Sequence, residues 1–236
     1  MQTSSSQKKQ ANSMTSLLWT LPQPLVVFGA MFLVASANAS GWTDADQLTT
    51  LLLLLPIPMW LLVERLAPKR GDWVLNWREY AEDAFWVGCV YLIWVPLYSD
   101  YYNTPISDAF VWLRDTTLIP VRLEATTTLG LMGAALVGVF VSEFIYYWLH
   151  RLQHRTMFFW RIHATHHHIT KMSVARADRT HPLEFLALNL GPAITLAFLG
   201  ASDAVVAVAL TFRIFSGYTN HTNLPMKSGI YGWLFT

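Results

Sequence analysis

Long stretches without a charged residue constrain this chain more than any other feature. Four of them lie between Lys9 and Asp44, between Asp46 and Glu64, between Asp83 and Asp100, and between Glu124 and Glu143. Each is close to the length of about 20 residues with which an α-helix crosses a bilayer. With 53% hydrophobic and only 13% charged residues, the composition also differs from that of a soluble domain. We therefore predict an all-α, multi-spanning membrane helical bundle with four spanning helices.

Prolines and further apolar stretches refine this prediction. Membrane helices tolerate proline where neighbouring helices satisfy the freed backbone groups, so kinks are expected at five positions: Pro22, Pro24, Pro56, Pro58 and Pro96. Two later uncharged stretches, 185–202 and 204–212, are compatible with two thin spans or with a hairpin that enters the bilayer partway. The sequence does not separate these two arrangements.

The distribution of lysine and arginine predicts an orientation. Cytoplasmic loops retain positive charge, and with residues before the first span placed inside, fourteen of the 16 lysines and arginines fall on the cytoplasmic side. Only Arg114 and Arg122 fall on the other side. This topology places residues 150–181 and His221 on the cytoplasmic face. The net charge of +1 excludes the strongly basic surface that nucleic-acid binding requires.

The first and last parts of the chain divide it into regions. Residues 1–16 form a polar leader that we expect to be disordered, and 17–126 form the N-terminal transmembrane region. An alternative for the N-terminus is a signal peptide, because Ala37-Asn38-Ala39 resembles a cleavage site after an apolar core. Residues 127–236 carry all eight histidines, which lie between positions 150 and 221.

Histidine spacing in this region predicts a metal site. His150 and His154 stand four residues apart at the end of the fourth span, so both imidazoles project from one helical face. In His163-Ala-Thr-His166-His167-His168, positions 163, 166 and 167 share a face, whereas 168 is rotated away by about 100°. Imidazole suits zinc, copper, iron and nickel, so the ligand type does not name the metal. Histidines that only bond to lipid headgroups are the alternative.

Three further side chains are candidates for the edges of this site. Glu143 lies seven residues before His150 on the same helical stripe, and an ionisable group near the membrane interior predicts a function, here the orientation of the ligands. The alternative for Glu143 is an ion pair with an interfacial arginine or a bond to a tyrosine hydroxyl. His181 precedes Pro182, and its position is compatible with either a structural role or a role in lining the site. For His168 we expect at most a role in lining the site.

At these residues the chain resembles the fatty acid hydroxylase superfamily and, within it, the sterol desaturase-like branch. The resemblance covers about 80 residues and is carried by Glu143-Phe-Ile-Tyr-Tyr-Trp-Leu-His150-Arg-Leu-Gln-His154, Trp160-Arg-Ile-His163-Ala-Thr-His166-His167-His168, Arg179-Thr-His181-Pro182-Leu-Glu184 and His221-Thr-Asn223. It implies a non-haem centre of two iron ions that uses O₂, receives electrons from a donor protein and hydroxylates or desaturates a lipid such as a sterol or fatty acyl chain. It also implies six metal ligands: His150, His154, His163, His166, His167 and His221.

The sequence departs from this family in two respects. The acidic residue before the first histidine pair is usually aspartate in such relatives, and here it is Glu143. A further His-x-x-His-His cluster is expected soon after His-Thr-Asn, and the sequence given stops at Thr236. We therefore expect 127–236 to be a fatty acid hydroxylase-like domain that is incomplete at its C-terminus and inactive alone. The alternatives are a zinc-dependent membrane hydrolase and a non-catalytic metal-binding membrane protein.

Overall fold

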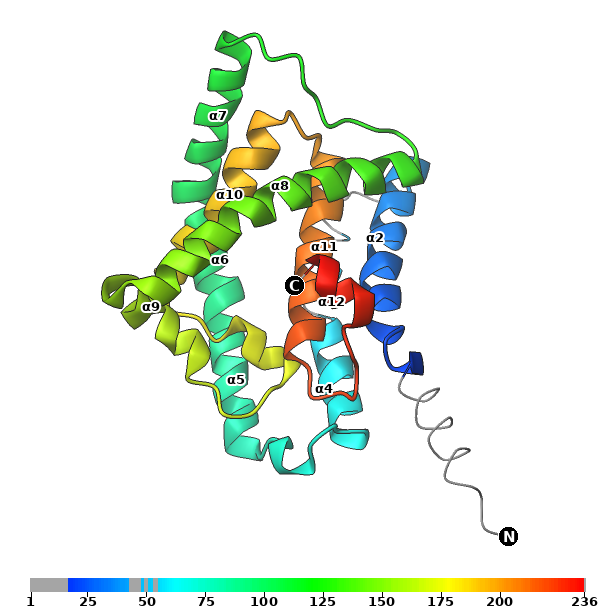
Figure 1. Ribbon diagram of the computed structural model, residues 1–236, viewed down its shortest axis with the longest axis vertical. Helices are drawn as coiled ribbons and strands as arrows, with labels where there is room; N and C mark the ends of the chain where they lie inside the picture. The colour runs from blue at the N-terminus through cyan, green and yellow to red at the C-terminus, as the bar shows by residue number, and fades with distance from the viewer. Residues whose placement is uncertain (1–16, 43–47, 49–50, 53–54, 236) are drawn as a thin grey trace.

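The computed structural model describes residues 17–42, 48, 51–52 and 55–235, and every regular element within these residues is a helix (Figure 1). The prediction of an all-α chain is therefore confirmed for the described residues. The polar leader, 1–16, lies outside them, as does part of the second uncharged stretch. That stretch is described mainly as α4, Pro56–Leu66.

Three helices that are far apart in the sequence form the apolar core. They are α2 (Pro22–Ser40), α8 (Thr128–Arg155) and α11 (Asp203–His221), and α11 packs against both of the others. Aliphatic side chains from all three are buried in one cluster: Val27, Met31, Val34, Leu131, Ala135, Val139, Val205 and Val208. The short helix α12 (Gly229–Phe235) adds Tyr231 to this cluster. The core thus fixes α8 and α11, two of the helices that carry candidate ligands at their C-terminal ends.

The two later uncharged stretches form separate helices. The first is α10 (Glu184–Phe198), which packs against α8 and α7, and the second is the apolar part of α11. A Cβ atom at Gly191 of α10 would lie 2.8 Å from the carbonyl oxygen of Ser142 in α8, so only glycine allows this close crossing. The turn between α10 and α11 contains Gly200, whose φ of 62° also favours glycine.

A continuous helical run from residue 77 to residue 116 contains two π-helical segments. The elements are α5 (Trp77–Cys89), η2 (Val90–Trp94), α6 (Val95–Tyr98), η3 (Ser99–Asn103) and α7 (Thr104–Thr116), and the short 3₁₀ helix η1 (Gly71–Trp73) precedes them. Each π-helical segment ends two residues before a proline, Pro96 or Pro105. Because proline cannot donate the usual helical hydrogen bond, the wider turn accommodates the missing donor.

The other predicted kinks are wrong for a simple reason. Pro22 and Pro56 are the first residues of α2 and α4, and Pro24 and Pro58 follow within the same first turns. The first N–H groups of a helix have no intrahelical acceptor, so proline is accommodated there without bending the helix. These prolines begin helices instead of interrupting them.

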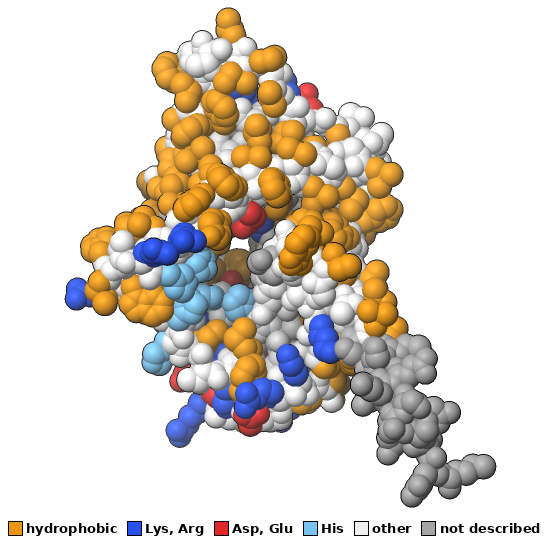
Figure 2. Space-filling view, viewed as in Figure 1, with side chains coloured by type: hydrophobic (Ala, Val, Ile, Leu, Met, Phe, Trp, Pro, Cys, Tyr) orange, Lys and Arg blue, Asp and Glu red, His pale blue; other side chains and the backbone are white. Residues whose placement is uncertain are grey.

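Two helices, α2 and α8, are long and apolar enough to cross a membrane, and α10 is a shorter apolar helix. Large apolar side chains on α8 face outward, among them Leu129, Phe140 and Phe144, which are 76%, 71% and 61% exposed. In Figure 2 hydrophobic side chains cover most of the upper part of the visible face, and most of its charged side chains lie in the lower part. This division suits an apolar region inside a bilayer and a polar region at its surface.

Candidate metal centre

The candidate metal centre lies where α8 ends and α9 (Met157–His167) begins. His150 and His154 occupy the last two turns of α8, and Thr156 has extended backbone angles that end this helix and start the next. Because α9 packs against α8, the face that carries His163 and His167 meets the first pair. Local spacing places each pair on one face, and the turn at Thr156 brings the two faces together.

Four imidazoles converge in this cluster. The ligand atoms of His150, His154, His163 and His167 all lie within 4.8 Å of one another. The Nε2 atom of His154 is 2.9 Å from that of His150 and 3.2 Å from that of His163, and the Nε2 atoms of His163 and His167 are 3.0 Å apart. These four residues, which we call the four-histidine cluster, can hold a metal ion.

Hydrogen bonds on the far side of the rings fix which nitrogen faces the cluster. The Nδ1 atom of buried His163 lies 2.9 Å from Oε1 of Glu184, which also accepts a hydrogen bond from the Gln153 amide. Burial alone would raise the pKa of Glu184, but the hydrogen bonds from His163 and Gln153 lower it. The carboxylate oxygen accepts a hydrogen bond from Nδ1–H, so Nε2 of the neutral His163 ring presents a lone pair to its neighbours. Converging lone pairs are the arrangement that a metal cation stabilises.

His166 and His221 form a second pair beside the cluster. Their Nε2 atoms are 3.3 Å apart, although 55 residues separate them in the sequence. The Nδ1 atom of His221 lies 2.8 Å from the carbonyl oxygen of Gly217, which can only accept, so its Nε2 also presents a lone pair. The six predicted ligands therefore divide into a group of four and a pair.

Protonation of the pair is unfavourable in the folded protein. Burial, and then the nearby rings of His221 and His163, lower the pKa of His166 from 6.5 to about 4. Burial also lowers the pKa of His221. Both rings therefore stay neutral at pH 7, which is the form that binds a metal.

This shift predicts how stability depends on pH in the metal-free protein. Between pH 6.5 and about 4 the unfolded chain binds a proton at His166 and the folded chain does not, so stability present above pH 6.5 is lost as the pH falls. We expect thermal unfolding to move to lower temperature across this interval. His166→Gln should weaken the pH dependence, whereas His168→Gln, at an exposed position, should leave it unchanged. Equal pH dependence in all three proteins would contradict this prediction.

The remaining predicted site residues lie at the edge of the cluster or away from it. His168 follows the last residue of α9 and is exposed. The Nδ1 atom of His181 accepts a hydrogen bond from the backbone N–H of Leu183, and its carbonyl accepts one from Glu184, so His181 shapes the turn before α10. Glu143 forms a 2.6 Å ion pair with Arg213, which corresponds to the alternative considered for it.

Several residues that support the ligands carry no role in the sequence analysis. Glu184 and Gln153 orient His163, and the Tyr146 hydroxyl lies 3.1 Å from Nδ1 of His150. Trp160 stacks on His167 with ring centroids 5.5 Å apart. Glu184 is the last residue of the motif that begins at Arg179. A carboxylate at the start of an otherwise apolar helix was the sequence signal that could have indicated its supporting role.

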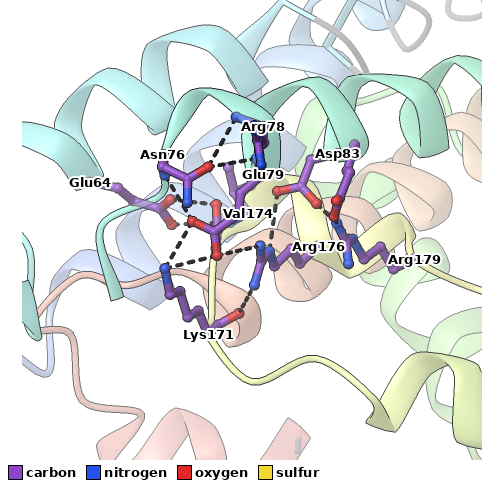
Figure 3. Close-up of polar contacts among 11 residues, drawn as sticks. Glu64, Asn76, Arg78, Glu79, Asp83, Lys171, Val174, Arg176 and Arg179 are labelled. Carbon is purple, nitrogen blue, oxygen red and sulfur yellow. Dashed lines mark hydrogen bonds and ion pairs between the residues drawn. The ribbon is translucent and has the colours of Figure 1, made fainter. Parts of the chain in front are cut away.

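Two groups of polar contacts hold the loops around the ligands. The first is an ion-pair network in which Glu79 and Asp83 of α5 bind Lys171, Arg176 and Arg179 of the segment that follows α9 (Figure 3). This segment includes the short helix η4 (Val174–Asp178).

The second group centres on the buried carboxylate of Glu64 in α4. It accepts hydrogen bonds from Ser173 and Val174 in that segment and from Thr222 and Asn223, directly after His221. The N-terminal half of the chain therefore positions segments that carry or adjoin the ligands.

The cluster is open to one side of the molecule. Figure 2 shows histidine side chains gathered on the visible face beside a hollow between its apolar and charged parts. An open pocket of about 300 Å³ is lined by His154, Trp160 and the residues 155–157 between α8 and α9. A ligand can thus approach the cluster from the boundary between the two parts.

The comparison with protein families matches the part of the chain that carries the histidines. Residues 135–236 match the family model described as fatty acid hydroxylase. Ornithine lipid hydroxylase OlsE of Rhizobium tropici is 33% identical over 101 residues, which are 42% of this chain and 30% of that relative. The matched region thus spans less than a third of the curated relative. No solved structure matches this chain.

Proposed function

We propose that this protein, whose residues 135–236 match the fatty acid hydroxylase family model, is a multi-pass membrane enzyme that uses iron and O₂ to hydroxylate a lipid. The observation that carries this proposal is the convergence of the four-histidine cluster at the end of an apolar helix long enough to cross a membrane. A lipid lying in the bilayer could reach such a site from the side. A hydrolase acting on soluble substrates would not need this arrangement.

The metal in this proposal is a pair of iron ions. The four-histidine cluster would hold one ion, and His166 and His221 would contribute to the second. The donor set fits, because Glu184 and the Gly217 carbonyl orient two of the imidazoles with unprotonated Nε2 atoms toward the centre. Bound iron would supply the O₂ chemistry that an unactivated C–H bond requires. The chain supplies position, neutral ligands and an opening between the apolar and polar parts.

The membrane arrangement belongs to the same proposal. We place α2 and α8 across the bilayer, with the apolar stretches of α4, α5–α7 and α10–α11 as further spanning or embedded segments. The excess of lysine and arginine expected on one side supports a cytoplasmic position for the histidines. Exposed Arg151 and Arg155 would there face phosphate headgroups or an acidic electron-donor protein.

The decisive experiment measures metal content and oxygen incorporation together. We expect the purified protein, loaded anaerobically with ferrous iron and supplied with a chemical reductant, to transfer one atom from isotopically labelled O₂ into a lipid. An ornithine lipid is the first substrate to test, because the relative is named for it. Ester cleavage that depends on zinc and not on O₂ would instead identify a hydrolase. Bound metal without reaction on any lipid would overturn the enzymatic proposal in favour of a non-catalytic metal-binding protein.

A further inference from the structure

An ion pair interrupts the apolar surface of the helices above the metal centre. Glu143 is the first charged residue of α8, and Arg213 is the only lysine or arginine in α11. Oε1 of Glu143 lies 2.6 Å from Nε of Arg213. Charged groups within apolar helices are costly, and they commonly serve function where they face a cavity or a pathway.

Arg213 is fully engaged by the protein. Its Nε pairs with Glu143, and both terminal nitrogens donate to the carbonyl oxygen of Leu188 in α10, at 3.4 and 3.3 Å. Its guanidinium also lies over the Tyr146 ring, 5.8 Å from the centroid. With only 19% of its side chain exposed, Arg213 is a fixed support for the carboxylate.

The carboxylate of Glu143 is the accessible member of the pair. Its side chain is 40% exposed, and its neighbours Phe140 and Phe144 on α8 are exposed apolar groups. The ion pair uses Oε1, so part of the carboxylate stays open to the surroundings, where a polar group from outside the protein can meet it. A hydrogen-bond donor with positive charge is the best complement to this carboxylate.

The pair is connected to the metal centre. The Tyr146 ring that lies against Arg213 carries the hydroxyl that is 3.1 Å from Nδ1 of His150. Seven residues, about 10 Å along the helix, separate Glu143 from His150. A group held at Glu143 would therefore set which part of an attached chain reaches the cluster.

We propose that Glu143, supported by Arg213, determines substrate specificity by binding a primary or secondary ammonium group of the lipid. This inference rests on the proposed function, because it assigns the substrate class of the same site. A quaternary ammonium carries the charge but no N–H donor, and an alcohol carries a donor but no charge. Comparing these two groups with a primary amine therefore separates the contribution of the charge from that of the hydrogen bond.

The test measures ligand binding in the metal-free protein, so that it does not depend on turnover. The protein is placed in phosphatidylcholine nanodiscs, and tryptophan fluorescence is quenched by single-chain brominated amphiphiles that end in a primary amine, a trimethylammonium or a hydroxyl. We expect the amine to bind about tenfold more tightly than the other two, as for a hydrogen bond between charged groups. Glu143→Gln should abolish this preference, and Glu143→Asp should retain part of it.

The matched control is Glu124→Gln, which alters an exposed carboxylate whose partner, Arg122, is 4.0 Å away. It should keep the full preference for the amine. Equal binding of the three amphiphiles by the unmodified protein would overturn the proposal, and so would a preference that survives in Glu143→Gln. Equal binding by the unmodified protein is informative even if the Glu143 variants fail to fold. Amine preference without oxygen incorporation in the iron-loaded protein would instead reject the proposed hydroxylase and leave the binding site in place.

Discussion

Replacing His163 with alanine should remove metal from the four-histidine cluster. Nε2 of His163 lies 3.2 Å from that of His154 and 3.0 Å from that of His167, so this ring links the histidines of α8 to those of α9. Its loss also leaves the buried Glu184 carboxylate with Gln153 as its remaining hydrogen-bond donor. Because altering only a group behind a ligand typically costs 10- to 100-fold in affinity, we expect removal of the ligand itself to cost more than about 100-fold. Metal titration followed by elemental analysis measures this loss.

The control for this prediction is His168→Ala. His168 lies at the end of the same helix but is exposed and belongs to neither histidine group, so metal affinity should not change. Thermal unfolding of both metal-free variants distinguishes loss of a ligand from loss of the fold. Metal retained at full affinity by a folded His163→Ala protein would refute the assignment of the cluster.

The histidine site could be predicted largely because its spacing is local. His150 and His154, like His163 and His167, are four residues apart and therefore share a face of one helix whatever the rest of the chain does. His166 follows His163 by three residues and is rotated to the other side of that face, toward His221. A helical wheel groups all three histidines of α9, and only the tertiary structure divides them between two positions.

The supporting residues could not be predicted from spacing, because they lie in other elements. Glu184 meets His163 across 21 residues, and Glu64 meets Thr222 across 158. The count of positive charges uses Arg176 and Arg179 only to predict an orientation, and it does not reveal that their side chains pair with Asp83. The spacing of Glu79, Glu82 and Asp83, which places three acidic side chains on one face of α5, was the signal that this loop has a partner.

The long apolar helices could be predicted less completely than the histidine cluster. The uncharged stretches that follow Lys9 and Glu124 identify α2 and α8, because each stretch coincides with a helix long enough to cross a membrane. The stretch from Asp83 to Asp100 instead runs from α5 through η2 and α6 into η3, inside a longer helical run. Absence of charge shows where a chain can be buried in lipid, but helix boundaries also depend on caps such as Asn76, which begins α5.

The ion-pair network gives the largest expected effect on stability. Asp83 is 1% exposed and binds both Arg176 and Arg179, at 3.2 and 2.7 Å. Asp83→Asn leaves two guanidinium groups, one of them buried, without their shared counter-charge, and such a loss typically costs about 3–5 kcal/mol. Since the segment held by this network follows directly after His167, metal affinity should fall together with the free energy of unfolding.

Glu82→Gln is the matched control, because Glu82 is the adjacent residue and also pairs with Arg179, at 2.9 Å. Its side chain is 64% exposed, so solvent screening should limit its contribution to less than about 1 kcal/mol. Chemical or thermal unfolding of the two variants in detergent measures the difference. If both changes destabilise the protein equally, burial is not what makes the Asp83 contacts strong, and the network does not hold the metal-binding segment in the way described.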